Sequence, residues 1–131
     1  MTVFADASAL IALITGEDGA ESLADRLEAD TARLCSAPSV WETVAGLCRS
    51  YIFSVPTARD HVRLFLDAGR FRFVAIGGRE WEIATDAYAQ FGKGRHPAAL
   101  NMGDCFAYAC AKSNRATLLY TGEDFAKTDL A

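Results

Sequence analysis

Short β-prone runs alternate with longer segments of helical periodicity, and this alternation restricts the fold more than any other feature of the sequence. The predicted strands are Thr2–Ala5, Ala32–Ala37, Phe71–Ile76 and Thr117–Tyr120. The predicted helices are Ala9–Ile14, Ala20–Glu28, one from Ser39, one from Thr57, one marked by Trp81 to Phe91, and Met102–Ser113. This pattern favours an α/β fold with a mainly parallel central sheet flanked by helices.

Polar residues at the predicted helix starts supply capping signals. The predicted N-caps include Ser8, Ser39, Thr57 and Asn101. Glu42 follows Ser39 by three residues, and Asp104 follows Asn101 by three, which is the spacing of a capping box. Both acids are therefore predicted to lie in the first turn of a helix.

Length and charge limit the class of protein. A chain of 131 residues is the usual size of one domain, so residues 1–131 are expected to form a single core. The net charge of −4 argues against a general basic coat for nucleic acid, so a nucleic acid would have to be held locally. No apolar run is long enough to span a membrane, and the N-terminus lacks the basic start of a signal peptide. We expect a cytoplasmic protein with free cysteine thiols.

Four acids fall at comparable points of the predicted fold. Asp6 directly follows the first strand, Asp124 lies a few residues after the last strand, and Glu42 and Asp104 begin helices. In parallel sheets, sites form outside the carboxyl ends of the strands, so these acids can share one crevice. Carboxylates gathered there would repel one another unless a cation lay among them. Oxygen ligands favour Mg²⁺, or Mn²⁺, over Zn²⁺.

Each acid also has a structural interpretation. Glu42 and Asp104 could serve only as capping partners, and Asp124 could be a turn residue. Asp6 resists such an interpretation, because an acid inside a buried apolar stretch is costly unless it is paired, hydrogen-bonded or metal-bound.

The segments around the four acids resemble the acidic motifs of a known family. VFADASALIALI, APSVWETVAGL, LNMGDCFAYACAK and LLYTGEDFAKTDL are similar to the four motifs of PIN domains, and more closely to those of VapC toxins. The resemblance covers nearly the whole chain and implies a single PIN-like three-layer domain over residues 1–131. It implies that the metal-binding and catalytic residues are Asp6, Glu42, Asp104 and Asp124. It also implies supporting roles for Ser8 and Asn101.

The same resemblance implies a function and partners. The chain would be a metal-dependent endoribonuclease toxin that hydrolyses RNA with a Mg²⁺-activated water. A cognate antitoxin would block the site in a hetero-oligomer. The family usually pairs into homodimers, and exposed parts of the second, third and fourth predicted helices could supply that surface. Lys93, Arg95 and His96 could contact RNA phosphates, or they could belong to an ordinary solvated loop. Trp41 and Trp81 could stack on bases, but their helical spacing favours core packing.

Three other classes of protein fit less well. A phosphoacceptor receiver domain requires an acid pair after its first strand, and here Asp6 stands alone. A haloacid-type phosphatase requires a second Asp two residues after the first, where this chain has Ser8. A non-catalytic RNA- or antitoxin-binding PIN module remains the alternative, and it predicts missing acids.

Overall fold

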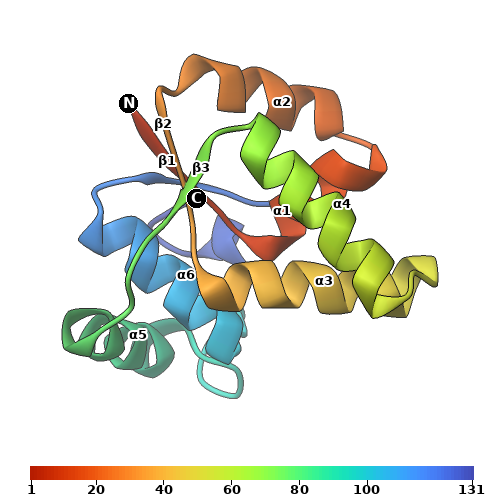
Figure 1. Ribbon diagram of the computed structural model, residues 1–131. Coiled ribbons are helices and arrows are strands. Elements are labelled where there is room, and N and C mark those ends of the chain that lie inside the picture. The colour runs from red at the N-terminus through yellow and green to blue at the C-terminus, as the bar shows by residue number, and fades with distance from the viewer.

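The computed structural model describes residues 1–131 and contains a four-stranded sheet in which every strand pair is parallel (Figure 1). The strands are β1 (Thr2–Ala5), β2 (Ala32–Cys35), β3 (Phe71–Phe73) and β4 (Thr117–Leu119), in the order β3-β2-β1-β4. In the register of the sheet, Phe4 of the central strand β1 pairs with Leu34 of β2 and Leu118 of β4. The predicted parallel sheet is confirmed.

Helices cover both faces of this sheet. They are α1 (Ala7–Thr15), α2 (Ala20–Ala29), α3 (Ala37–Tyr51), α4 (Val55–Ala68), α5 (Gly78–Phe91) and α6 (Met102–Ser113), followed by the short 3₁₀ helix η1 (Phe125–Lys127). Figure 1 shows α5 and α6 on the other side of the strands from α2 and α4. The arrangement is the predicted three-layer α/β fold.

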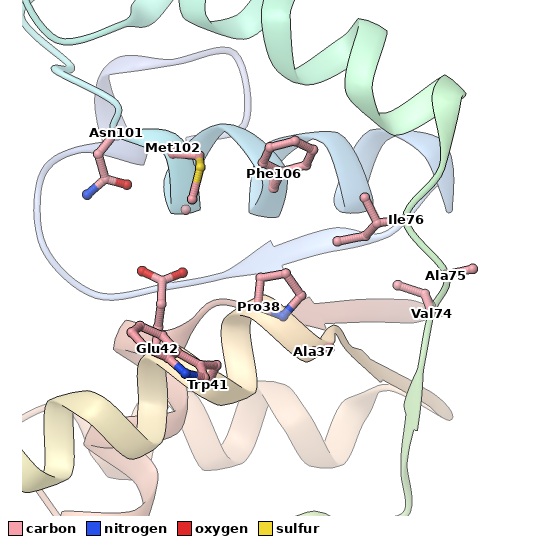
Figure 2. Close-up of a pocket in the computed structure, with 11 residues that line it drawn as sticks. Ala37, Pro38, Trp41, Glu42, Val74, Ala75, Ile76, Asn101, Met102 and Phe106 are labelled. Atoms are coloured by element: carbon pink, nitrogen blue, oxygen red, sulfur yellow. The ribbon is translucent and has the colours of Figure 1, made fainter.

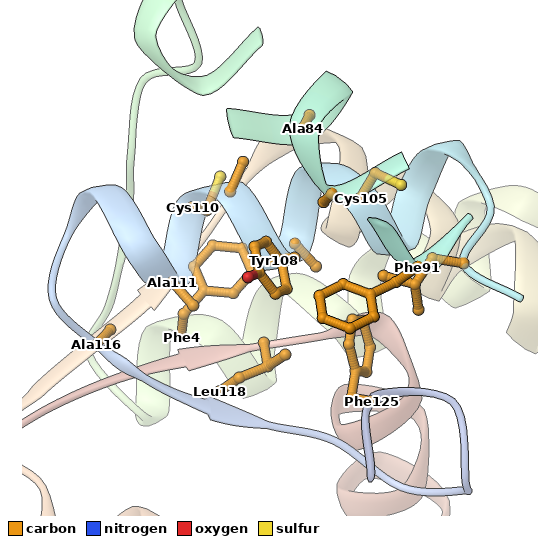
Figure 3. Packing of buried hydrophobic residues seen from close by; sticks show 14 of the residues in the cluster. Phe4, Ala84, Phe91, Cys105, Tyr108, Cys110, Ala111, Ala116, Leu118 and Phe125 are labelled. Atoms are coloured by element: carbon orange, nitrogen blue, oxygen red, sulfur yellow. The ribbon is translucent and has the colours of Figure 1, made fainter. Parts of the chain in front are cut away.

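Alternation along β1 divides the core between the two faces. Phe4 packs with Leu34 and Leu118 in a cluster under α5 and α6 (Figure 3). Val3 and Ala5 point to the opposite face, where they pack in the clusters that α1 to α4 cover. Because β1 is buried on both faces, the residue that follows it also lies at the edge of the core.

Several element boundaries differ from the sequence prediction. β3 ends at Phe73, not at Ile76, and β4 ends at Leu119, not at Tyr120. Pro38 does not end β2; it lies in the first turn of α3, where a missing backbone N–H costs nothing. Thr57 does not cap α4, because the Oγ of Ser54 accepts the Thr57 N–H at 3.3 Å and the helix begins earlier.

The cysteines are free thiols, as predicted: Cys35, Cys105 and Cys110 are buried and Cys48 is half-buried. No helix has both the length and the hydropathy that crossing a bilayer requires.

Candidate active site

The carboxyl ends of β1 and β4 position the first acid. Asp6 directly follows β1, and its backbone N–H donates to the carbonyl of Leu119 at 2.9 Å. Its Oδ2 accepts hydrogen bonds from the N–H of Ser8 at 3.1 Å and from the hydroxyl of Ser8 at 2.7 Å. Asp6 is therefore the N-cap of α1, and the prediction that Ser8 caps this helix is wrong. The Asp6 carboxylate reaches forward to the free N–H groups, so the helix begins at Ala7.

Ser8 instead connects two parts of the site. Its hydroxyl donates to Asp6 and accepts the backbone N–H of Thr121 at 3.1 Å. Thr121 lies in the loop between β4 and η1 that carries Asp124. One hydroxyl thus joins the Asp6 carboxylate to the loop of the fourth acid.

Glu42 lies on α3 and takes no part in capping that helix. Ser36 is the N-cap of this helix; its Oγ accepts the Ser39 N–H at 3.2 Å, and the Ser39 Oγ accepts the Ser36 N–H at 3.1 Å. Ser39 was predicted as the cap, and that prediction is wrong because Ser36 lies at the end of the preceding strand and reaches the same free N–H groups. Glu42 lies in the second turn, so its interpretation as a capping partner is excluded.

The Glu42 carboxylate lies against the first turn of α6. A Cβ at Gly103 would overlap both carboxylate oxygens of Glu42, so a side chain at this residue would displace them. Figure 2 shows the Glu42 carboxylate pointing from α3 toward Asn101 and Met102. Sequence reasoning missed the role of Gly103. The available signal was a glycine inside a helix start, where it is disfavoured by about 1 kcal/mol relative to alanine.

Asp104 combines a capping role with a place beside the other acids. Its backbone N–H donates to the Oδ1 of Asn101 at 2.9 Å, and its Oδ2 accepts the Asn101 N–H at 3.1 Å. The predicted capping box is confirmed. Asn101 is the N-cap of α6 and orients the Asp104 side chain through this reciprocal pair.

Three of the four acids line one hollow of about 300 Å³: Asp6, Glu42 and Asp104. Ser8 and Arg49 also line it. Asp124 does not; it is an exposed residue at the start of η1. Its charge nevertheless raises the pKa of both Asp6 and Asp104, which places it within electrostatic reach of the hollow.

Burial and mutual repulsion disfavour the charged forms of the lining acids. Burial is the largest cause of the raised pKa of Asp6, and the Ser8 hydrogen bonds oppose it. Burial also raises the pKa of Glu42, with further contributions from the charges of Asp6 and Asp104. The pKa of Asp104 is raised to about 6, first by burial and then by the charges of Asp6 and Asp124.

No protein cation neutralises this group. The ion pairs of the structure are Arg63–Asp60 and Lys112–Asp129, and neither involves a residue of the hollow. Acids held together without a counterion are suited to binding an external cation.

The donor set fits a hydrated hard cation better than a dehydrated one. No three acidic, histidine or cysteine side chains lie close enough to ligate one ion directly. Mg²⁺ commonly keeps several of its waters and binds through one or two carboxylates, so the spacing of Asp6, Glu42 and Asp104 is compatible with it. Oxygen-only chemistry also disfavours Zn²⁺.

A larger apolar groove of about 840 Å³ adjoins the acids (Figure 2). Trp41 and Glu42 line both this groove and the acidic hollow, while Ile76, Met102 and Phe106 supply apolar surface. Trp41 is 70% exposed and Trp81 of α5 is 58% exposed. The prediction that both tryptophans pack in the core is wrong, because the helical stripe that carries each one faces a groove that no other element of the chain covers.

In the loop between α5 and α6, two of the three residues predicted to contact RNA make contacts within the protein instead. The Nδ1 of His96 accepts the Ala98 N–H at 3.0 Å, and the guanidinium of Arg95 lies 5.0 Å from the centre of the Tyr88 ring. Lys93 is exposed and lines a second apolar hollow together with Trp81 and Asn101. None of the three lines the acidic hollow.

Comparison with known proteins decides the family. The model of the PIN domain family matches residues 3–130. The VapC ribonuclease of Rhizobium meliloti is 41% identical over 139 residues, which cover 97% of this chain and 98% of that protein. The chain is a PIN domain of the VapC ribonuclease family. Ribonuclease VapC30 of Mycobacterium tuberculosis is also 41% identical to this VapC-family chain, over 96% of it and 94% of the relative.

Solved structures agree on the fold. The VapC20 toxin of Mycobacterium tuberculosis, which cleaves the sarcin-ricin loop, superposes with a TM-score of 0.71 at 18% identity, covering 95% of this chain and 93% of that one. A chain of a toxin-antitoxin complex from Klebsiella pneumoniae gives a TM-score of 0.70 at 21% identity, over 99% and 94% of the two chains. The VapC-type three-layer fold predicted from the motifs is confirmed.

Proposed function

We propose that this VapC-family toxin is an endoribonuclease that hydrolyses RNA phosphodiester bonds with Mg²⁺, or Mn²⁺, held by Asp6, Glu42, Asp104 and Asp124, in part through waters that the ion keeps. The observation that carries the metal assignment is the convergence of three buried or half-buried acids on one hollow that contains no paired cation. Family membership supports the ribonuclease activity and the toxin role.

The protein's own groups have distinct tasks in this hypothesis. Ser8 keeps Asp6 oriented and favours its ionised form, as a ligand requires. Asp104, held by its reciprocal hydrogen bonds with Asn101, would join Asp6 and Glu42 in holding the metal beside the attacking water. Bound metal would lower the pKa of that water and stabilise charge on the phosphate oxygens. The expected products carry a 5′-phosphate and a 3′-hydroxyl.

Cleavage of total cellular RNA tests the proposal. Protein free of antitoxin is incubated with Mg²⁺, with Mn²⁺ or with chelator, beside the variants Asp104→Asn and Asp86→Asn. Asp86 is an exposed acid of α5 and serves as the matched control. Discrete fragments that require both metal and Asp104 support the nuclease, and sequencing their ends identifies the RNA. Folded wild-type protein that does not cleave with either metal favours the non-catalytic binding module.

We propose further that a cognate antitoxin occludes the acidic hollow. The toxin-antitoxin complex from Klebsiella pneumoniae, which shares the fold, supports a protein partner for this chain as well. The product of an adjacent reading frame, added at equimolar concentration, should abolish the metal-dependent cleavage. Undiminished cleavage in a preparation that contains the assembled complex would contradict occlusion.

We also propose a homodimer formed through the apolar surface of α3, α5 and α6. Trp41, Met102 and Phe106 line the first groove, and Trp81 and Tyr88 extend the surface along α5. Glu42 and Lys93 are the only charged residues among those that line the two grooves, and depletion of charge is typical of homodimer cores. This surface lies mainly on α5 and α6, whereas the sequence placed it on the second, third and fourth predicted helices.

Light scattering after gel filtration distinguishes the two surfaces. Trp81→Glu should convert a dimer into a monomer. Leu64→Glu on α4, where the side chain is 70% exposed, should leave the dimer intact. A wild-type monomer, or dissociation by the α4 variant alone, would contradict the proposed dimer surface.

A further inference from the structure

One arginine lies among the acids of the candidate active site. Glu42, Gly46 and Arg49 occupy positions i, i+4 and i+7 of α3, so they share one face of the helix. Arg49 lines the same hollow as Asp6, Glu42 and Asp104. It is the only cationic residue that does so.

The Arg49 side chain lies back along α3, beside Gly46. A Cβ built at Gly46 would overlap the Cδ1 of Ile11 and would lie 3.9 Å from the Nη2 of Arg49. The guanidinium therefore lies over the helical turn between Glu42 and Arg49, on the side of the acids. Side chains of a helix favour this direction, toward the N-terminal turn.

Arg49 has no partner within the protein. It forms no hydrogen bond and no ion pair, although three acids line the same hollow. Its positive charge is not among the causes that act on the pKa of Asp6, Glu42 or Asp104. The guanidinium is thus not the counterion of the acids, and its five N–H donors are free for an external group.

The chemistry of this group selects an anion with paired oxygens. A guanidinium matches phosphate in a two-pronged geometry, and such contacts are about twice as strong as neutral hydrogen bonds. The chain as a whole is acidic, with a net charge of −4, so RNA approaching the carboxylates meets repulsion. A single free cation at the rim of the hollow offsets that repulsion locally.

We propose that Arg49 binds a backbone phosphate of the RNA strand next to the cleaved bond and thereby holds that bond over the acids. The inference rests on the proposed function, because it takes the acidic hollow as the place of cleavage. Arg49 is a substrate-positioning residue in this arrangement. Contacts to phosphate set the register of the strand without reading its sequence.

Binding of a labelled RNA tests the contact without requiring cleavage. The probe is a fluorescein-labelled single-stranded RNA of mixed sequence, titrated by anisotropy over a range of salt concentrations in an Asp104→Asn background with Mg²⁺. Adding Arg49→Gln should weaken binding roughly tenfold at low salt, the effect of losing one charged hydrogen-bonding group. It should also reduce the slope of log K against log salt by about 0.7, the contribution of one phosphate in a single strand.

Two further variants distinguish a specific contact between Arg49 and phosphate from a non-specific effect of the protein's net charge. Arg49→Lys keeps the positive charge but lacks the paired donors of the guanidinium. Compared with Arg49→Gln, it should restore the salt slope of RNA binding and only part of the affinity. Arg26→Gln removes the same charge from an exposed position of α2 and should change neither quantity. With otherwise wild-type protein, Arg49→Gln should raise KM, and kcat should fall as well, because the bond would no longer be held over the acids.

The outcomes distinguish this inference from the proposed function. An unchanged affinity and slope for Arg49→Gln overturn it, as does an equal effect of Arg26→Gln or a background protein that does not bind the probe at low salt. A fall in Tm for Arg49→Gln without a change in slope also overturns it, because Arg49 would then serve only the C-terminal turn of α3. Failure of the nuclease proposal appears separately, as wild-type protein that does not cleave RNA with metal.

Discussion

The carboxylate of Glu42 occupies the space that a side chain at Gly103 would fill. These residues belong to α3 and α6, which meet here beside the apolar groove (Figure 2). The contact places an acid of one helix against the first turn of another, where free N–H groups and the helix dipole favour negative charge. The absence of a side chain at Gly103 therefore determines where the Glu42 carboxylate lies in the site.

Gly103→Ala should separate activity from stability. The added methyl group would displace the Glu42 carboxylate and reduce cleavage by at least about tenfold, the scale expected for misplacing a group at a reaction centre. Stability should stay equal or rise by up to about 1 kcal/mol, because alanine favours helix and the clashing group is flexible. Initial cleavage rates and urea denaturation measure the two effects.

A matched glycine provides the control for this variant. Gly78 begins α5, and a Cβ there would meet nothing within 4 Å. Gly78→Ala should therefore leave cleavage unchanged. A similar loss of activity in both variants would show that the effect at residue 103 is not steric.

Ser8→Ala should shift the pH profile of cleavage. The Ser8 hydrogen bonds lower the pKa of Asp6 against the effect of burial, so removing the hydroxyl should raise that pKa further. The acidic limb of the profile should then move to higher pH, and stability should fall by about 1 kcal/mol from two lost hydrogen bonds. Rates measured between pH 5 and 9 test the shift; an unchanged profile with reduced stability would limit Ser8 to a structural role.

Asp104 should make the metal-free protein less stable as pH rises. Its pKa of about 6 in the folded protein exceeds the ordinary value of 3.8, so between these values the folded state binds more protons than the unfolded state. The free energy of unfolding therefore falls as pH rises from about 4 to about 6. Asp104→Asn should flatten this dependence and, at pH 7.5 in chelator, raise Tm by about 4 °C, the shift that about 1 kcal/mol produces.

Mg²⁺ provides the complementary measurement. Added to wild-type protein at pH 7.5, it should raise Tm, because a ligand bound only by the folded state stabilises that state. The Asp104→Asn variant should respond less. An equal rise in both proteins would exclude Asp104 from the metal site.

Tyr108→Phe should reduce stability without affecting catalysis. The Tyr108 hydroxyl donates to the Oδ1 of Asp129 at 2.7 Å, and Lys112 contacts the other oxygen, so this group fastens the C-terminal segment to α6. Loss of the hydroxyl should cost about 1 kcal/mol. Tyr120, whose hydroxyl has no hydrogen-bond partner in the protein, supplies the control Tyr120→Phe. Equal effects in urea denaturation would contradict the assignment.

The sequence alone determined the order of the elements and the parallel sheet, and it singled out four acids, of which the structure brings Asp6, Glu42 and Asp104 to one hollow. These follow from local patterns: apolar periodicity, Asn101 three residues before Asp104, and motifs in which each acid has characteristic neighbours. The caps at Ser8 and Ser39 were mispredicted because Asp6 and Ser36, at the ends of strands, reach the same N–H groups. Each helix start has two nearby side chains with a suitable oxygen. The direction of the chain as it leaves the strand decides which oxygen accepts the free N–H groups, and the local sequence does not show that direction.

Only the tertiary structure decided which apolar faces are covered and which side chains share the hollow. Periodicity shows that Trp41 lies on an apolar stripe, but another element must pack against that stripe to bury it, and none does. The space for Glu42 at Gly103 and the place of Arg49 beside the acids depend on how α3 meets α6 and α1. Such contacts join residues distant in the chain, and their geometry comes from the packing of whole helices.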